Sequence, residues 1–103
     1  MAKILVIIDD NGLKGLAYEC IRTMSEDEPG ILFIHNGAFL PILMPDKNKI
    51  QEFIKKGIPL FGIFRDFMLR GIEAKIGNEL QLVDYNEFIK LIMEKYDKVI
   101  SFL

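Results

Sequence analysis

The residues best placed to do chemistry in this chain are an adjacent arginine and aspartate, Arg65 and Asp66, flanked by two phenylalanines. They follow the apolar run Leu60–Phe64, which has the length of a buried strand and which Pro59 can begin but not interrupt. A strand that is apolar on both faces indicates a covered parallel sheet, where ligands bind beyond the carboxyl ends of the strands. We therefore expect Arg65 and Asp66 to form a binding site for an anion or a carboxylate, with no nucleophile beside them.

The single histidine, His35, follows another apolar run, Ile31–Ile34, and so belongs at the same edge of the predicted sheet. Two interpretations stay open for it. It joins Arg65 and Asp66 as a binding residue, or it is an ordinary hydrogen-bonded residue of the surface.

Cys20 carries the only thiol of the chain and is the residue we expect to form any covalent intermediate. It recurs with Leu16, Ala17 and Met24 at helical spacing, which is typical of a small buried hydrophobic residue. A reactive thiolate is favoured by a helix N-terminus or a cationic neighbour. Cys20 lies about two turns into the predicted helix, and Arg22 projects from another face. A structural role and a functional role both remain open.

The run Ile4–Ile8 ends in Asp9-Asp10-Asn11, which resembles the paired acids that hold Mg²⁺ in response-regulator receiver domains. The other residues that a receiver site requires are not found at their expected positions. Pro41 stands where the phosphorylated aspartate would precede Met44-Pro45, and Lys98 begins the last predicted strand instead of ending it. We interpret the acids as turn and capping residues, and keep a receiver-like module that binds phosphate or a small molecule as an alternative.

These residues need elements to position them, and strands are expected to alternate with helices. Strands are predicted at residues 4–8, 31–34, 60–64, 80–83 and 99–103, and helices at 13–24, 46–57, 66–71 and 84–96. Asp66 is expected to cap the third helix and Gly71 to end it, while Asp84 and Glu87 have the spacing of a capping box. The order predicts a single α/β domain over residues 1–103, with a doubly wound, mostly parallel five-stranded sheet and helices on both faces.

The last of these helices carries a row of apolar residues at helical spacing, which predicts a stripe facing the core. Its members are Tyr85, Phe88, Ile89, Ile92, Met93 and Tyr96.

Composition narrows the class of protein. Half of the residues are hydrophobic and the mean hydropathy is +0.23, but no apolar run approaches the ~20 residues of a membrane helix. The net charge of −2, with acids and bases interspersed, argues against direct nucleic-acid binding. One cysteine and one histidine predict no metal site, and we expect no cofactor. Met1-Ala2-Lys3 leads directly into an apolar run without a cleavage site, so we expect a cytoplasmic protein.

The hydrophobic content also exceeds what so small a domain can bury, which indicates a homo- or hetero-oligomer. The segment 38–45 is apolar but broken by two prolines. We expect Phe39, Leu40, Ile42 and Met44 of this segment to contact a partner subunit.

From residue 31 onward, four motifs stand in a fixed order: Ile31–Gly37, Ile58–Ile63, Asp66–Gly71 and Leu82–Ile89. They contain an Asn-Gly after the second strand, a D-x-x-x-R-G turn and a V-D-Y-x-x-F-I helix start. Together they resemble the DsrH/TusB family of DsrE-like sulfur-relay proteins. Length and element order match this family over the whole chain.

The resemblance implies a small subunit that assembles with DsrE/TusD-like and DsrF/TusC-like subunits and receives sulfur from a TusA-like carrier. Such complexes pass persulfide sulfur toward 2-thiolation of the tRNA wobble uridine or toward sulfur oxidation. The family's main sulfur-carrying cysteine belongs to the DsrE/TusD subunit, and the matching place here, Ile63–Arg65, has none. Some DsrH members carry a cysteine in the first helix, where Cys20 falls, although TusB members need not.

The resemblance thus favours a mainly structural, non-catalytic subunit that binds partners and carries sulfur on Cys20 at most. Arg65 is then expected to hold a persulfide anion or a partner carboxylate, and Phe64, Phe67 and Met68 to join the interface. A homo-oligomeric scaffold without sulfur chemistry is the remaining alternative.

Overall fold

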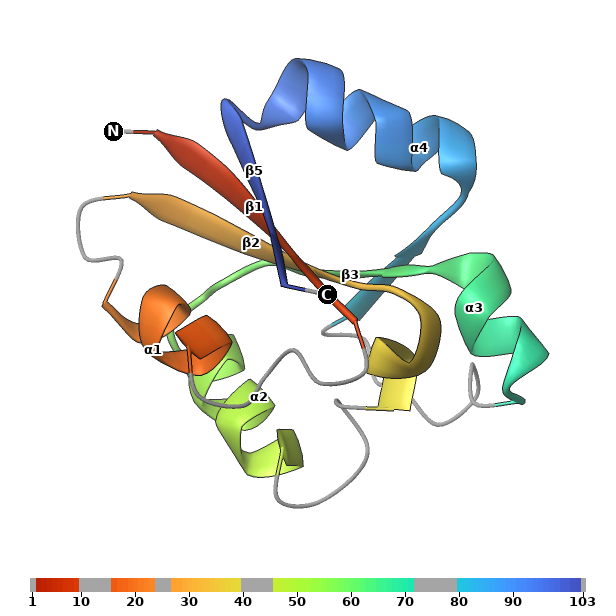
Figure 1. Cartoon of the computed structure of the whole chain (residues 1–103), viewed down its shortest axis with the longest axis horizontal. Coiled ribbons are helices and arrows are strands. Elements are labelled where there is room, and N and C mark those ends of the chain that lie inside the picture. Colours follow the sequence, from red (N-terminus) through yellow and green to blue (C-terminus); the bar gives the residue numbers. More distant parts are fainter. Residues whose placement is uncertain (1, 10–15, 24–26, 40–45, 72–79, 103) are drawn as a thin grey trace.

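The computed structural model describes residues 2–9, 16–23, 27–39, 46–71 and 80–102. Its centre is a five-stranded sheet in the order β4-β3-β2-β1-β5, in which every neighbouring pair is parallel (Figure 1). The strands are β1 (Lys3–Ile8), β2 (Glu28–Phe33), β3 (Leu60–Ile63), β4 (Leu80–Val83) and β5 (Lys98–Phe102). The predicted wound α/β sheet is confirmed.

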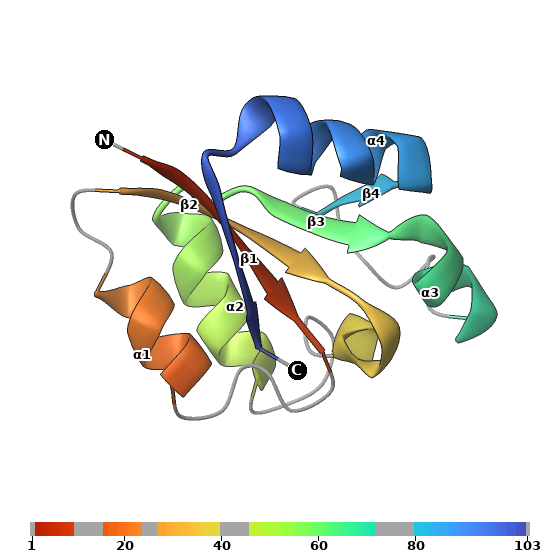
Figure 2. The same cartoon turned by 45° about the horizontal axis from the view of Figure 1, so that its top comes forward.

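Helices cover both faces of this sheet. The elements are α1 (Leu16–Arg22), the short helix η1 (His35–Phe39), α2 (Asp46–Lys55), α3 (Phe64–Leu69), α4 (Tyr85–Lys90) and its π-helical continuation η3 (Leu91–Lys95). Figures 1 and 2 show α1 and α2 together on one face and α4 on the other. This follows from right-handed crossovers, because the chain moves from β1 through β4 in one direction and returns across the sheet to β5. No described helix is long and apolar enough to cross a membrane.

The inner strands are buried because their residues are apolar on both faces. In β1 only Lys3 is exposed, and the five residues Ile4–Ile8 are buried. The strand β2 begins three residues earlier than the sequence indicated, at Glu28. Pro29 and Gly30 disfavour a strand by propensity, but proline is tolerated near a strand's first residue.

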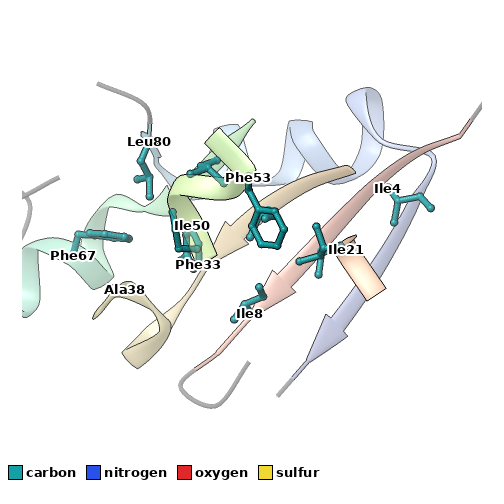
Figure 3. Close-up of a cluster of buried hydrophobic side chains, with 12 residues drawn as sticks. Ile4, Ile8, Ile21, Phe33, Ala38, Ile50, Phe53, Phe67 and Leu80 are labelled. Atoms are coloured by element: carbon teal, nitrogen blue, oxygen red, sulfur yellow. The ribbon is translucent and has the colours of Figure 1, made fainter. Parts of the chain in front are cut away.

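The larger core lies between the sheet and the helices α1, α2 and α3 (Figure 3). Its fully buried phenylalanines are Phe33, Phe53 and Phe67, which come from β2, α2 and α3. Gly62 in β3 makes room for one of them, because a Cβ at this position would overlap the ring of Phe67. The smaller core lies under α4 and η3, where Leu91 packs with Leu5, Ile7, Leu32, Ile63 and Val83.

Helix ends agree with the sequence in two places and differ in a third. Asp84 and Glu87 form the predicted capping box, and Gly71 adopts the expected positive φ of 65° after α3. Asp66 does not cap α3, however. The strand β3 stops at Ile63, the helix already starts at Phe64, and Asp66 lies inside its first turn. A buried hydrogen-bonding role, described below, takes the place of the expected cap.

The apolar row of the last helix is also not the single core stripe that its spacing indicated. Phe88, Ile92 and Tyr96 are partly buried against the smaller core, but three other members point away from it. We call these three the outer stripe: Tyr85, Ile89 and Met93, whose exposed fractions are 55%, 55% and 76%. The apolar arc of this helix is therefore wider than its own sheet can cover.

Candidate functional site

The carboxyl ends of β1, β2 and β3 lie side by side and bring together Asp9, His35 and Asp66. The Nδ1 atom of His35 lies 3.2 Å from Oδ2 of Asp9. The backbone N–H of His35 donates a hydrogen bond of 2.9 Å to Oδ2 of Asp66. His35 thus links the residue after β1 to the helix after β3, and the sequence was right to place it beside Asp66.

The backbone at His35 has a φ of 50°, a left-handed conformation that residues other than glycine adopt at a cost. Two contacts fix it there. One is the bond to Asp66, and the other is the close packing of Gly37 against the carbonyl of Ile8, where a Cβ would sit only 2.5 Å from the oxygen. The turn after β2 is therefore held against the ends of both neighbouring strands.

Asp66 is the one buried charged residue of the described chain. Besides the His35 bond, its Oδ1 lies 3.8 Å from Nη1 of Arg70, and that nitrogen donates to the Asp66 carbonyl at 3.0 Å. The i,i+4 spacing brings this pair together on one face of the helix. Asp66 has a structural role at the carboxyl edge of the sheet, because its carboxylate contacts the backbone N–H of His35 and the guanidinium of Arg70.

Arg65 lies apart from this group. Its side chain is exposed on α3, and no hydrogen bond or ion pair joins it to the described part of the chain. The cation beside Asp66 is Arg70, which the sequence analysis included in the D-x-x-x-R-G motif but did not assign to the binding group. The i,i+4 spacing of Asp66 and Arg70 was the signal that could have found it.

The group Asp9, His35 and Asp66 contains neither a thiol nor a hydroxyl. No cluster of three or more histidine, cysteine, aspartate or glutamate residues in the described ranges could hold a metal ion. Asp10, Asn11 and Pro41, on which the receiver comparison depended, lie outside the described residues. This edge has an exposed imidazole held next to a carboxylate, and the exposed guanidinium of Arg65 belongs to α3, the helix that also carries Asp66.

Cys20 belongs to a different part of the molecule. It lies in the second half of α1, and Figures 1 and 2 both place α1 and α3 at opposite sides of the fold. Its side chain is half-buried, between the buried Ile21 and the exposed Glu19 in the same helix. The structure therefore does not bring Cys20 to His35 or Asp66, and any reaction of its thiol takes place on the α1 side of the fold.

The predicted contact residues separate into four groups. Phe39 is partly buried against the larger core, while Leu40, Ile42 and Met44 lie outside the described residues. Phe67 is fully buried in the chain's own core, beneath Gly62, and so is not available to a partner. Phe64 and Met68 are exposed on α3, at 43% and 48%, together with Leu69, which the sequence reading did not single out. We call Phe64, Met68 and Leu69 the α3 patch.

Comparison with protein families gives a match over most of the chain. Residues 14–99 match the family model described as DsrH like protein. Among curated relatives, Protein TusB of Pectobacterium carotovorum strain PC1 is 34% identical over 47 residues, which are 46% of this chain and 50% of that protein. Protein TusB of Escherichia coli K12 is 25% identical over 75 residues, or 72% of this chain and 75% of that protein. The match thus spans half of the first relative and three quarters of the second.

A solved structure supports the fold independently. The ychN protein from E. coli superposes with a TM-score of 0.78, covering 99% of this chain and 100% of that one. The sequence identity is 14%, so this likeness concerns the fold alone.

Proposed function

The chain belongs to the DsrH-like protein family, and we propose from this that it is a subunit of a complex that relays persulfide sulfur. Its main task in this proposal is to build the assembly, since the described group at the carboxyl edge of its sheet, Asp9, His35 and Asp66, has no thiol that could carry sulfur. The partners we propose are a DsrE/TusD-like and a DsrF/TusC-like subunit, with sulfur arriving from a TusA-like carrier. The destination is 2-thiolation of the tRNA wobble uridine or the oxidation of sulfur.

The observation that carries this proposal is the apolar surface that the fold leaves uncovered. The outer stripe runs along α4 and η3 at positions i, i+4 and i+8, so its three side chains lie in one row. A monomer rarely exposes contiguous apolar side chains, and a helix buries such a row against another element. The α3 patch adds a second apolar surface. Both are suited to a neighbouring subunit.

The test is co-expression of a tagged form of this chain with the DsrE-like and DsrF-like proteins of its source organism. We expect the three chains to purify together and to remain together during gel filtration. Elution of this chain alone as a monomer would overturn the proposal, and a stable assembly of this chain with itself would favour the homo-oligomeric scaffold.

A sulfur-carrying role for Cys20 is the finer part of the proposal. The thiolate of Cys20 would attack the outer sulfur of a donor persulfide, releasing the donor as a thiol and leaving a persulfide on Cys20. The half-buried position of Cys20 on α1 allows access from solvent or from a partner. No external oxidant is needed, because the sulfur passes from one thiol to another.

This step predicts a mass change that can be read directly. Incubation with a persulfide-loaded carrier should raise the mass of the intact chain by one sulfur atom, and Cys20→Ser should abolish the increase. The matched variant Thr23→Ser, at the exposed residue that directly follows α1, should leave it intact. A chain that gains no sulfur is a purely structural subunit.

Arg65 is the residue we propose for holding an anionic group of a partner, because its guanidinium is exposed and is engaged by no described residue. In the co-purified complex, Arg65→Gln should therefore weaken assembly more at low salt, where an ion pair is least screened, than at high salt.

A further inference from the structure

A cavity of about 550 Å³ opens at the amino edge of the sheet, on the opposite side from His35 and Asp66. It lies where β1 and β2 begin, at Lys3 and Glu28, and where the chain enters β3 through Ile58 and Pro59. Cavities that bind small molecules are commonly of roughly 300–1,000 Å³. A cavity of this size could hold many ligands, so the class of ligand has to be inferred from the residues that line it.

One wall of the cavity is apolar and partly aromatic. Phe61 from β3 and Tyr96 after η3 meet edge to face, with their ring centroids 6.4 Å apart, and Leu91 lies in the same wall. Phe61 and Gln81 are register partners on neighbouring strands, so both project from the face of the sheet that carries η3. This wall favours a flat apolar body, which aromatic rings contact at little cost in conformational entropy.

The wall also carries polar groups that the fold does not use. The hydroxyl of Tyr96 lies against Gly30, where any Cβ would overlap it, so the glycine makes room for the tyrosine. No described residue forms a hydrogen bond with that hydroxyl or with the amide of Gln81. Burial, and secondarily the charge of Glu28, raise the pKa of Tyr96 above 10.0, so its hydroxyl stays protonated and able to donate. A ligand with an acceptor would satisfy it.

The charged rim has more cations than anions. Three lysines line it, Lys3, Lys56 and Lys95, against Asp27 and Glu28. The lysines differ in whether they form an ion pair. The ammonium of Lys56 lies 3.7 Å from Glu52, whereas Lys3 and Lys95 form no ion pair with the described residues. Of the two acids, Asp27 already accepts the backbone N–H of Ala2 at 3.3 Å. Asp27 keeps its charge in that bond, so the rim carries three ammonium groups against two carboxylates.

We propose that this cavity binds a small molecule with a flat apolar body and one anionic group. The body lies against Phe61 and Tyr96, an acceptor of the ligand takes the Tyr96 hydroxyl hydrogen, and the anion lies near Lys3 and Lys95. The site is independent of the proposed sulfur relay, because it uses neither Cys20 nor the outer stripe. Its success or failure in experiment therefore leaves that proposal untouched.

Three probes with one ring system and different charges test the ligand class: 2-naphthalenesulfonate, 2-naphthol and 2-naphthylmethylammonium. Each is titrated into the ¹⁵N-labelled full chain, and amide shifts are followed by NMR. We expect saturable shifts around Phe61, Gln81 and Tyr96, with the sulfonate binding most tightly and the ammonium least. Tighter binding of the ammonium, or shifts confined to the outer stripe at Ile89 and Met93, would overturn the proposal, as would the absence of saturation.

Variants then assign the contacts. Tyr96→Phe should weaken sulfonate binding about threefold to tenfold, the range of one net hydrogen bond. Lys95→Gln should weaken it about twofold to fivefold and Glu28→Gln should strengthen it, because the two remove opposite charges from the rim. Lys90→Gln, on α4 outside the cavity, is the matched control and should change nothing. The same spectra show that each variant is folded, and equal affinities for all four would contradict the proposed site.

Discussion

His35 has the only described non-glycine backbone with positive φ, and the residue that holds it there is Asp66, thirty-one positions further along the chain. Such a conformation persists only where its surroundings compensate for it. Here the compensation is a charge-assisted hydrogen bond from the His35 N–H to a buried carboxylate.

Removal of that carboxylate should therefore destabilise the fold. Asp66→Ala leaves the His35 N–H without its acceptor and should lower the free energy of unfolding by about 1–3 kcal/mol. Asp66→Asn keeps an oxygen acceptor in the same place and should cost less. Urea unfolding of the three proteins measures the order, and an alanine variant as stable as wild type would show that the bond is not needed.

The sequence predicted part of this group and missed the rest for a physical reason. The ends of parallel strands meet at one edge, so His35 and Asp66 could be placed together from the element order alone. Their roles could not, because the N-cap of α3 is Ile63, three residues before the expected Asp66, and this shift turned the expected cap into a buried acceptor. The same shift exchanged Arg65 for Arg70 as the cation that Asp66 meets.

Among the elements, β3 and α3 are joined by the fit of one ring under one glycine. The ring of Phe67 occupies the space that a side chain at Gly62 would need. Glycine in a strand is otherwise unfavourable, so its presence here is explained by packing and not by a turn.

Gly62→Ala should therefore destabilise the fold by about 1–3 kcal/mol, the usual cost of overpacking a core. Adding Phe67→Leu to that variant should recover part of the loss, although Phe67→Leu alone is destabilising. Thermal unfolding of the two single variants and the double variant gives the coupling. Strictly additive effects would mean that the two residues do not share this space.

The helices α1 and α2 are joined on their own face by a hydrogen bond of 2.7 Å, which the Tyr18 hydroxyl donates to Oε2 of Glu52. The ring of Tyr18 also packs on Phe53, at 5.6 Å between centroids. The hydrogen bond raises the pKa of Tyr18 above 10.0 and lowers that of Glu52 below 4.5.

This bond should give stability a defined dependence on pH. Because the pKa of Glu52 is lower in the folded chain, its contribution is present above pH 4.5 and is lost as the pH falls through the folded value. For Tyr18 the shift is upward, so the contribution is present below pH 10.0 and is lost above it. The difference in unfolding free energy between wild type and Tyr18→Phe should be constant near neutral pH and shrink at both extremes. A difference that does not change between pH 3 and pH 7 would contradict this account.

The strongest departure from the sequence concerns α4 and η3. Spacing correctly predicted a helix with a capping box and an apolar row. Spacing cannot say how much of a wide apolar arc one sheet face will cover, because that depends on where the helix crosses the strands. The element was predictable, but its free surface became visible only in three dimensions.

At the scale of the whole molecule, this chain exposes two apolar surfaces, the outer stripe and the α3 patch. Half of the residues are hydrophobic, and the sequence rightly indicated more apolar surface than one small chain can bury. It pointed to the segment 38–45 and to Phe64, Phe67 and Met68 for that surface, and it overlooked α4. In this account the subunit acts mainly by binding its partners through these apolar surfaces, and less by a reaction of its own side chains.

The most direct test of this account is sedimentation velocity of the chain mixed with its DsrE-like and DsrF-like partners. Two variants that add one negative charge are compared with wild type: Ile89→Glu in the outer stripe, and Gln51→Glu on the exposed face of α2. We predict that wild type and Gln51→Glu sediment within one larger complex, while Ile89→Glu sediments largely as the free chain. An Ile89→Glu chain that stays in the complex as completely as Gln51→Glu would contradict the role assigned to the outer stripe.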